Sequence, residues 1–230
     1  MNVLSDIGGS LEIQGVVQTG SPLVALIWAV VGFAGGWLVR WGSVKLAILE
    51  ELEPGHKRWQ VWGPPIVSAL VFAAFGFELG LDWLLVVRSV FALVLVQVMF
   101  FDFEHRLILD RVIFPSMGLA LAYSVLTNPP NQWWYGLATG IAAGLLFALL
   151  ALAGALIFKA EALGFGDVKF ATFMGLLLGP LPTIQALFYG VFIAGVVSIV
   201  IIIWRRSMKG TIAYGPYLAA GTLIVLYQMR

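Results

Sequence analysis

The sequence predicts an all-helical, polytopic membrane protein with about eight transmembrane helices. Hydrophobic residues make up 61% of the 230 residues and charged residues only 11%, whereas soluble domains carry about 25% charged residues. So little charge cannot solvate the surface of a soluble domain, and so apolar a chain does not stay disordered. The apolar stretches are continuous, as over 145–158, whereas the strands of a transmembrane β-barrel alternate apolar and polar residues.

The expected elements follow one another with short connections, because a transmembrane helix needs about 20 residues. They are 22–40, 64–79, 81–101, 111–127, 133–158, 168–180, 183–204 and 211–228. The first span ends at Arg40, and the third ends at Asp102. The sixth span is short, so the bilayer must thin around it or neighbouring helices must shield it. Pro180 and Pro182 separate it from the seventh.

Basic residues indicate the orientation, because loops on the cytoplasmic side are enriched in Lys and Arg. With the N-terminus outside, the inside loops hold 11 of the 13 basic residues, namely Arg40, Lys45, Lys57, Arg58, Arg106, Arg111, Lys159, Lys169, Arg205, Arg206 and Lys209. We therefore expect both termini outside. Residues 1–21 contain no Lys or Arg, so they lack the basic start of a signal peptide and are expected to form a short outside tail.

We expect one membrane-embedded domain over 1–230, in which the polar segment 41–63 is a cytoplasmic loop that forms a surface helix or hairpin. Glycines spaced by four line one face of the first and fifth spans: Gly32 and Gly36, then Gly136, Gly140 and Gly144. Small residues let membrane helices approach closely, either across a dimer interface or within a bundle. In a chain with this many spans we favour packing within the bundle.

The composition excludes several kinds of site. The chain contains no cysteine, which rules out disulfides and cysteine-ligated zinc or iron–sulfur sites. The net charge of +1 provides no global field that would attract nucleic acid. His56 and His105 are the only histidines, and two lone histidines do not make a metal site. We therefore expect no metal, no cofactor and no nucleic-acid partner.

Two aspartates at the expected cytoplasmic edge are the candidate catalytic residues. Asp102 ends the third span and Asp167 begins the sixth, so the topology places them in the same layer of the membrane. Acidic residues in such positions are costly and often functional. In an aspartyl hydrolase, one ionised carboxylate takes a proton from water, while the other, protonated, polarises the scissile carbonyl. Alternatively, each aspartate caps a helix or pairs with a cation, as Asp167 can with Lys169.

The residues around Asp167 suggest supporting roles. Gly164 and Gly166 free the backbone before the aspartate and allow an extended substrate to come close. Lys169 lies two residues after it and either favours the charged carboxylate or anchors the chain at the cytoplasmic surface.

The segment that follows Asp102 is short and polar. His105 shares a helical face with the aspartate, and it is either a general base or an ordinary solvated interfacial histidine. Glu104 and Asp110 are expected to be solvated or to cap a helix.

Several segments resemble the prepilin peptidase family, the GxGD-type intramembrane aspartyl proteases that include preflagellin peptidases. DFEHRLILD (102–110) resembles the first aspartate motif of the family, and GFGDVKFATFMGLLLG (164–179) resembles the second. IAYGPYLAAGTL (212–223) resembles the Gly-Pro segment of the last helix, and GFAGGWLVRWGSV (32–44) resembles the opening helix of bacterial members. Because the resemblance covers nearly the whole chain, it implies a single membrane-embedded peptidase domain over 1–230. It also implies that Asp102 and Asp167 are catalytic, and that Glu104, His105, Gly164, Gly166, Lys169, Gly215 and Pro216 bind substrate or support the site.

The resemblance also implies a location and a substrate. It indicates an aspartic endopeptidase in the inner (cytoplasmic) membrane, with its active site facing the cytoplasm. The substrate would be a type IV prepilin-like protein, with a short basic leader and an apolar helix that lies in the lipid bilayer. Acidic residues on that side would meet the leader or balance local cations; they are Glu50, Glu51, Glu53, Glu104 and Glu161.

Two departures from the family stand out. Segment 41–63 lacks the paired CxxC motifs of many bacterial members, so the resemblance leaves their N-methyltransferase activity unsupported here. Leu109 stands where the family has a proline. A membrane transporter and a non-catalytic pilus-assembly subunit are the competing interpretations. The acids gather at one surface and not at the midplane, and no inverted repeat is visible, which favours the peptidase over a transporter.

Overall fold

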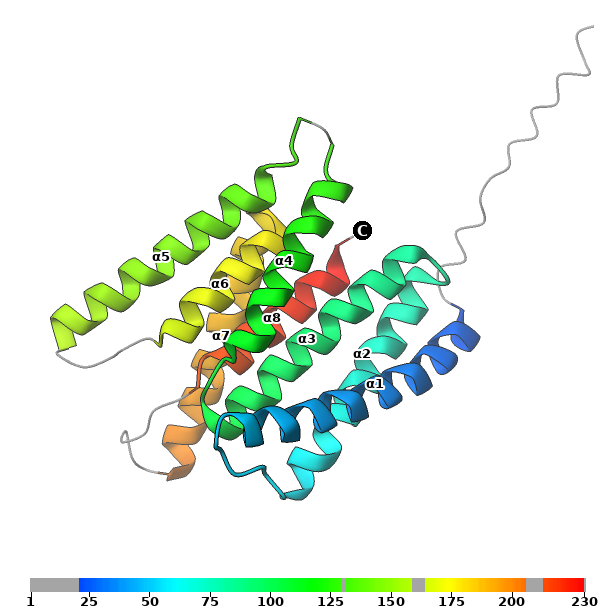
Figure 1. The fold of residues 1–230 in the computed structure, drawn as a ribbon, viewed down its shortest axis with the longest axis horizontal. Coiled ribbons are helices and arrows are strands. Elements are labelled where there is room, and N and C mark those ends of the chain that lie inside the picture. The colour runs from blue at the N-terminus through cyan, green and yellow to red at the C-terminus, as the bar shows by residue number, and fades with distance from the viewer. Residues whose placement is uncertain (1–20, 130, 159–163, 206–212, 230) are drawn as a thin grey trace, which may run out of the picture.

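The computed structural model describes residues 21–129, 131–158, 164–205 and 213–229, which form a bundle of packed α-helices (Figure 1). The helices are α1 (Pro22–Leu49), α2 (Arg58–Leu79), α3 (Trp83–His105), α4 (Asp110–Thr127), α5 (Tyr135–Phe158), α6 (Phe165–Leu178), α7 (Pro180–Arg205) and α8 (Gly215–Gln228). Each corresponds to one of the predicted spans, and the described residues contain no β-strand. The all-helical fold is therefore confirmed for this part of the chain.

Five of the described helices are long and apolar enough to cross a membrane, namely α1, α2, α3, α5 and α7. By contrast, α6 and α8 have 14 residues each and rise about 21 Å, less than the roughly 30 Å of a hydrocarbon core. Helix α6 packs against α4, α5, α7 and α8, and α8 packs against α3, α6 and α7. Neighbouring helices thus shield the short sixth helix. The number of crossings and the side of each terminus stay predictions.

The first two helices extend further than the sequence predicted. Helix α1 continues nine residues beyond Arg40 to Leu49, and α2 begins at Arg58. The connection between them is therefore only 50–57, and the polar segment 41–63 as a whole is not a loop. The extension has an apolar face, because Ala47 packs in a small buried cluster with Phe101 and Leu109. Tertiary packing beyond the span prolongs the helix.

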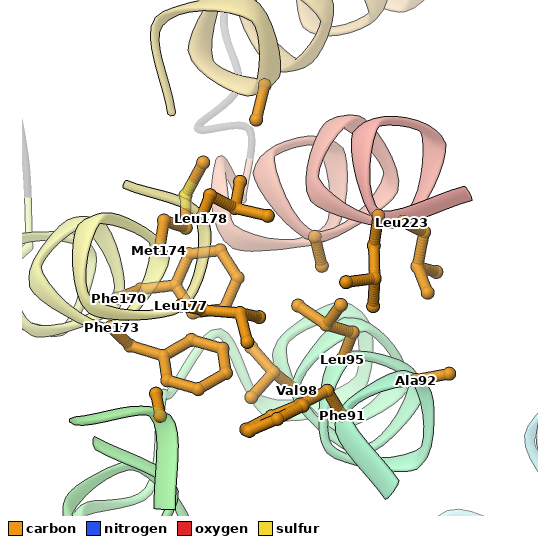
Figure 2. Packing of buried hydrophobic residues seen from close by; sticks show 14 of the residues in the cluster. Phe91, Ala92, Leu95, Val98, Phe170, Phe173, Met174, Leu177, Leu178 and Leu223 are labelled. Atoms are coloured by element: carbon orange, nitrogen blue, oxygen red, sulfur yellow. The ribbon is translucent and has the colours of Figure 1, made fainter. Parts of the chain in front are cut away.

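The core joins α3 to α6. Figure 2 shows Phe91, Leu95 and Val98 from α3 near Phe173 and Leu177 from α6. The rings of Phe91 and Phe173 lie 6.4 Å apart, and Figure 2 shows Leu223 of α8 on the Leu95 side of the cluster. Asp102 lies on α3 and Asp167 lies on α6. The packing of these two helices in the core therefore sets the relative positions of the two aspartates.

The spaced glycines pack inside the bundle, as predicted. A methyl group at Gly36 would lie 2.3 Å from the Cα of Pro65 in α2. In α5, a methyl group at Gly144 would lie 2.2 Å from Oγ1 of Thr172 in α6, and one at Gly140 would lie 2.7 Å from Cγ of Leu176 in α6. These are approaches that only glycine permits between helices. The glycine faces are therefore occupied by helices of the same chain.

Candidate active site

Asp102 lies in the last turn of α3, where the helix ends in an unusual way. The C-cap residue Arg106 has φ 55° in the left-handed region, and its N–H donates to the carbonyl of Asp102 at 2.9 Å. A residue in the left-handed conformation lets backbone N–H groups at a helix end donate to carbonyls of the last turn that would otherwise have no partner. The chain then turns sharply, and α4 begins four residues later at Asp110. This turn presents the segment 106–111 beside Asp102.

Asp167 lies in the first turn of α6, directly after the two glycines. Gly164 is the N-cap residue of the helix, and its N–H donates to Oδ2 of Asp167 at 3.3 Å. A methyl group at Gly166 would lie 3.1 Å from Cβ of Ile108, so the glycine lets the start of α6 approach the turn after α3. The two glycines therefore place Asp167 against the segment that follows Asp102.

The two aspartates share a pocket of about 510 Å³. Its walls are Asp102, the segments 106–111 and 164–167, Glu50 and Lys169. Asp102 is buried, with 5% of its surface exposed, whereas Asp167 is half-buried. Their carboxylates lie close enough for their charges to interact. The structure thus brings together the pair that the sequence placed only in one membrane layer.

Helix α8 completes the surroundings of Asp102. The backbone N–H of Gly215 donates a hydrogen bond to the Asp102 carboxylate, and a methyl group at Gly215 would lie only 2.6 Å from Oδ2 of Asp102. Gly215 begins α8 and Pro216 occupies its first turn, so the positive end of the helix dipole faces the carboxylate. Gly215 is thus placed at the aspartate, while Pro216 is buried behind it in the same turn.

Burial affects the pKa of Asp167, which directly precedes the sixth predicted span. It raises the pKa of Asp167 from its ordinary value near 4 to about 6, against the lowering effect of the hydrogen bond from Gly164. A carboxyl group with this pKa exchanges protons near neutral pH. The pocket therefore holds two interacting carboxyl groups of the kind that can share a proton.

Lys169 lines the pocket, but the ion pair it makes is with Asp110. Its Nζ lies 2.5 Å from Oδ1 of Asp110 and 5.0 Å from the ring centroid of Phe165. Asp110 stands in the first turn of α4, so this pair joins α4 to α6 beside Asp167. The alternative in which Asp167 is merely the partner of Lys169 loses support.

Glu104 and His105 lie outside the pocket lining. Glu104 pairs with Arg40 at 3.6 Å and with His105 at 3.3 Å, and its side chain is buried, with 8% exposed. The expectation of a solvated Glu104 is therefore wrong. The signal in the sequence was Arg40 itself, a charged residue within the apolar stretch that forms the long α1.

Several pocket residues carry no local signal in the sequence that marks them as site residues. Arg106, Ile108 and Arg111 line the pocket, and Glu50, considered only for leader binding, pairs with Arg111 at 3.2 Å. Their approach depends on the left-handed turn at Arg106, for which the sequence offers no glycine signal. Glu161 lies outside the described residues.

An all-helical bundle with two carboxylates in one pocket defines a class of membrane-embedded hydrolase candidates, and the comparisons give the family. The sequence model of the type IV leader peptidase family matches residues 89–199, which include both aspartates. The prepilin leader peptidase/N-methyltransferase of Bacillus subtilis (strain 168) is 30% identical over 160 residues, 69% of this chain and 62% of the relative. No solved structure matches the chain significantly. The chain belongs to the type IV leader peptidase family, and it spans about 62% of the length of this curated relative.

Proposed function

We propose that this chain is an aspartic endopeptidase that removes the leader peptide of type IV prepilin-like proteins at the cytoplasmic membrane surface. The observation that carries the proposal is the pocket that Asp102 and Asp167 share at one end of the bundle. Membership of the type IV leader peptidase family supports the substrate class. The inner-membrane location and the orientation toward the cytoplasm belong to the same proposal.

The chemistry follows from the two carboxyl groups. With a pKa of about 6, Asp167 is mostly ionised at neutral pH, and in that form it accepts a proton from an attacking water. The water oxygen bonds to the scissile carbonyl carbon, while the shared proton of the pair polarises the carbonyl oxygen. Collapse of the tetrahedral intermediate breaks the C–N bond, and the departing amine takes a proton from the carboxyl group that received it.

Acidic side chains in and beside the pocket provide partners for a basic leader, although Arg106, Arg111 and Lys169 also line the pocket. Glu50 lines the pocket, and Glu51 and Glu53 are exposed in the adjacent connection 50–57. Glu104 cannot serve in this way, because Arg40 and Gly55 already occupy its carboxylate. Reversing the three exposed charges should raise KM for a leader with several Lys or Arg residues, and an unchanged KM would exclude this binding mode.

The central test replaces each aspartate. Asp102→Asn and Asp167→Asn keep the side-chain size but remove the carboxylate, so each should lower leader cleavage by at least about a thousandfold. The assay follows release of the leader by mass spectrometry, with purified full-length protein and a prepilin-like substrate in liposomes. Asp82→Asn is the matched control, because Asp82 caps the opposite end of α3.

The same assay separates the remaining alternatives. Near wild-type cleavage by either asparagine variant would refute the aspartyl mechanism, and no cleavage by the wild-type protein would favour a transporter or a non-catalytic subunit. Serine- and cysteine-directed reagents and chelators should leave the rate unchanged. The name of the B. subtilis relative includes N-methyltransferase activity. We propose a peptidase without it, and a methylated product in the presence of a methyl donor would overturn that part.

A further inference from the structure

A buried polar cluster lies next to the active site but outside its pocket. It joins Arg40 of α1, Gly55 of the connection 50–57, and Glu104 and His105 of α3. The side chains of Arg40 and Glu104 are 9% and 8% exposed. Buried charges of this kind are stable only when each is paired and hydrogen-bonded.

The cluster holds the backbone of Gly55 from both sides. Its N–H donates to Oε1 of Glu104, and its carbonyl accepts from the guanidinium of Arg40. The two charged groups also face each other, with Nη1 of Arg40 3.6 Å from Oε2 of Glu104. The carboxylate of Glu104 thus meets the N–H of Gly55, and the guanidinium of Arg40 meets the Gly55 carbonyl. Each buried charge therefore has a backbone hydrogen-bond partner in the connection 50–57.

Gly55 fits this contact because it has no side chain. A methyl group there would lie 2.3 Å from Oε1 of Glu104 and 2.3 Å from Cδ of Gln60. Gln60 is itself buried and accepts from the N–H of Lys57 at 2.8 Å. A side chain at position 55 would therefore displace the carboxylate of Glu104 or the amide of Gln60 and disturb the contact.

The clamp acts on the turn that carries Asp102. Glu104 follows Asp102 by two residues in the last turn of α3, which closes through the Arg106 N–H on the Asp102 carbonyl. On the other side, the clamped connection begins at Glu50, which lines the pocket. The contacts of Gly55 therefore tie the connection 50–57 to the last turn of α3, which carries Asp102.

We propose that Arg40 and Glu104 are positioning residues, which clamp Gly55 against the last turn of α3 and thereby hold Asp102 in its reactive orientation. The proposal rests on the proposed function, because orientation has meaning only if Asp102 is catalytic. A displaced reacting group lowers the rate of chemistry more than it lowers binding. The clamp should therefore affect kcat while KM stays nearly constant.

The test compares variants that open the clamp to different degrees. Glu104→Ala removes both the acceptor and the charge, and should lower kcat at least about tenfold with KM changed less than about threefold. Glu104→Gln keeps an acceptor for the Gly55 N–H and should retain most of kcat. Gly55→Ala opens the clamp from the other side and should lower kcat as Glu104→Ala does. Gly118→Ala is the matched control, because a methyl group there meets nothing within 4 Å.

A second measurement separates positioning from general stability. Hydrogen exchange should show faster exchange over residues 51–57 in Glu104→Ala and Gly55→Ala, while α6 keeps its protection. A wild-type kcat in both variants would overturn the clamp. It would also be overturned if kcat fell only when hydrogen-exchange protection was lost throughout the chain. If Asp102→Asn abolishes cleavage while the clamp variants do not affect kcat, the proposed function stands and the clamp is wrong. If Asp102→Asn remains active, the proposed function fails first.

Discussion

Asp102 is an acidic residue that keeps 5% of its surface exposed, although acids are almost never buried unless they are paired. The Gly215 N–H donates to its carboxylate, and the charges of Asp167 and Arg106 act on it. The Gly215 N–H and the positive charge of Arg106 take the place of water around the carboxylate, whereas the Asp167 carboxylate repels it. The environment of this residue comes from three different helix ends, so small changes at any of them should affect the chemistry.

Gly215→Ala tests the contact with α8. The added methyl group would lie 2.6 Å from Oδ2 of Asp102 and 3.3 Å from Cδ1 of Ile108, so the carboxylate must move. We expect leader cleavage to fall by about ten- to a hundredfold, measured as kcat in the liposome assay. Gly195→Ala is the control, since a methyl group there meets nothing within 4 Å. Equal activity of the two variants would show that Asp102 tolerates displacement.

The protonation of Asp167 predicts a pH dependence. Its pKa is raised to about 6 by burial, and in the proposed mechanism the carboxylate form accepts the proton from water. Cleavage should therefore decline as the pH falls through about 6, by about tenfold per pH unit below it. The measurement is the pH profile of kcat/KM. An acid limb near 4, the ordinary value of an aspartate, would contradict a buried Asp167 acting as the base.

At the scale of elements, the candidate active site depends on how tightly α5 and α6 pack. Helix α6 carries Asp167 at its first turn, and nine of the eleven residues that follow it in the helix are buried. Its Gly175 faces α5, where a methyl group would lie 2.6 Å from the Cα of Gly140. Backbone on both sides leaves no flexible side chain that can give way. The position of Asp167 is therefore coupled to the packing of the whole helix.

Gly175→Ala should destabilise the protein by about 1–3 kcal/mol, because overpacking exceeds the gain in helix propensity. Thermal unfolding in detergent measures the change, and cleavage should fall as α6 shifts. In Gly118→Ala the added methyl group meets nothing, so stability should rise by up to about 1 kcal/mol. An unchanged unfolding temperature for Gly175→Ala, together with loss of a dimer, would favour a dimer interface instead.

At the scale of the whole molecule, the end of the bundle that carries the candidate active site is predicted to face the cytoplasm. The absence of cysteine makes this directly testable, because single cysteines can be introduced without background. Glu53→Cys lies in the connection beside the pocket, and Asn131→Cys lies between α4 and α5 at the opposite end. An impermeant maleimide added to intact cells should label Asn131→Cys but not Glu53→Cys. The reverse pattern would invert the orientation.

Much of the fold was predictable because each helix is marked by local composition. All eight expected spans correspond to described helices, since apolar length and proline or glycine breaks are local signals. The extents of α1 and α2 were not predictable, because the buried contact of Ala47 with Phe101 and Leu109 is formed between distant segments. For the same reason, Glu104 was expected to be solvated, although Arg40 and Gly55 reach it across the fold.

The sequence by itself determined the helical membrane class, the family resemblance and the two candidate aspartates, because scarce charge and short motifs can be interpreted without contacts. Only the tertiary structure decided that these aspartates meet in one pocket, that Gly215 of α8 donates to Asp102, and that Lys169 pairs with Asp110. The physical reason is that side-chain environment depends on helix packing and on a left-handed turn at Arg106, neither of which has a local sequence signature.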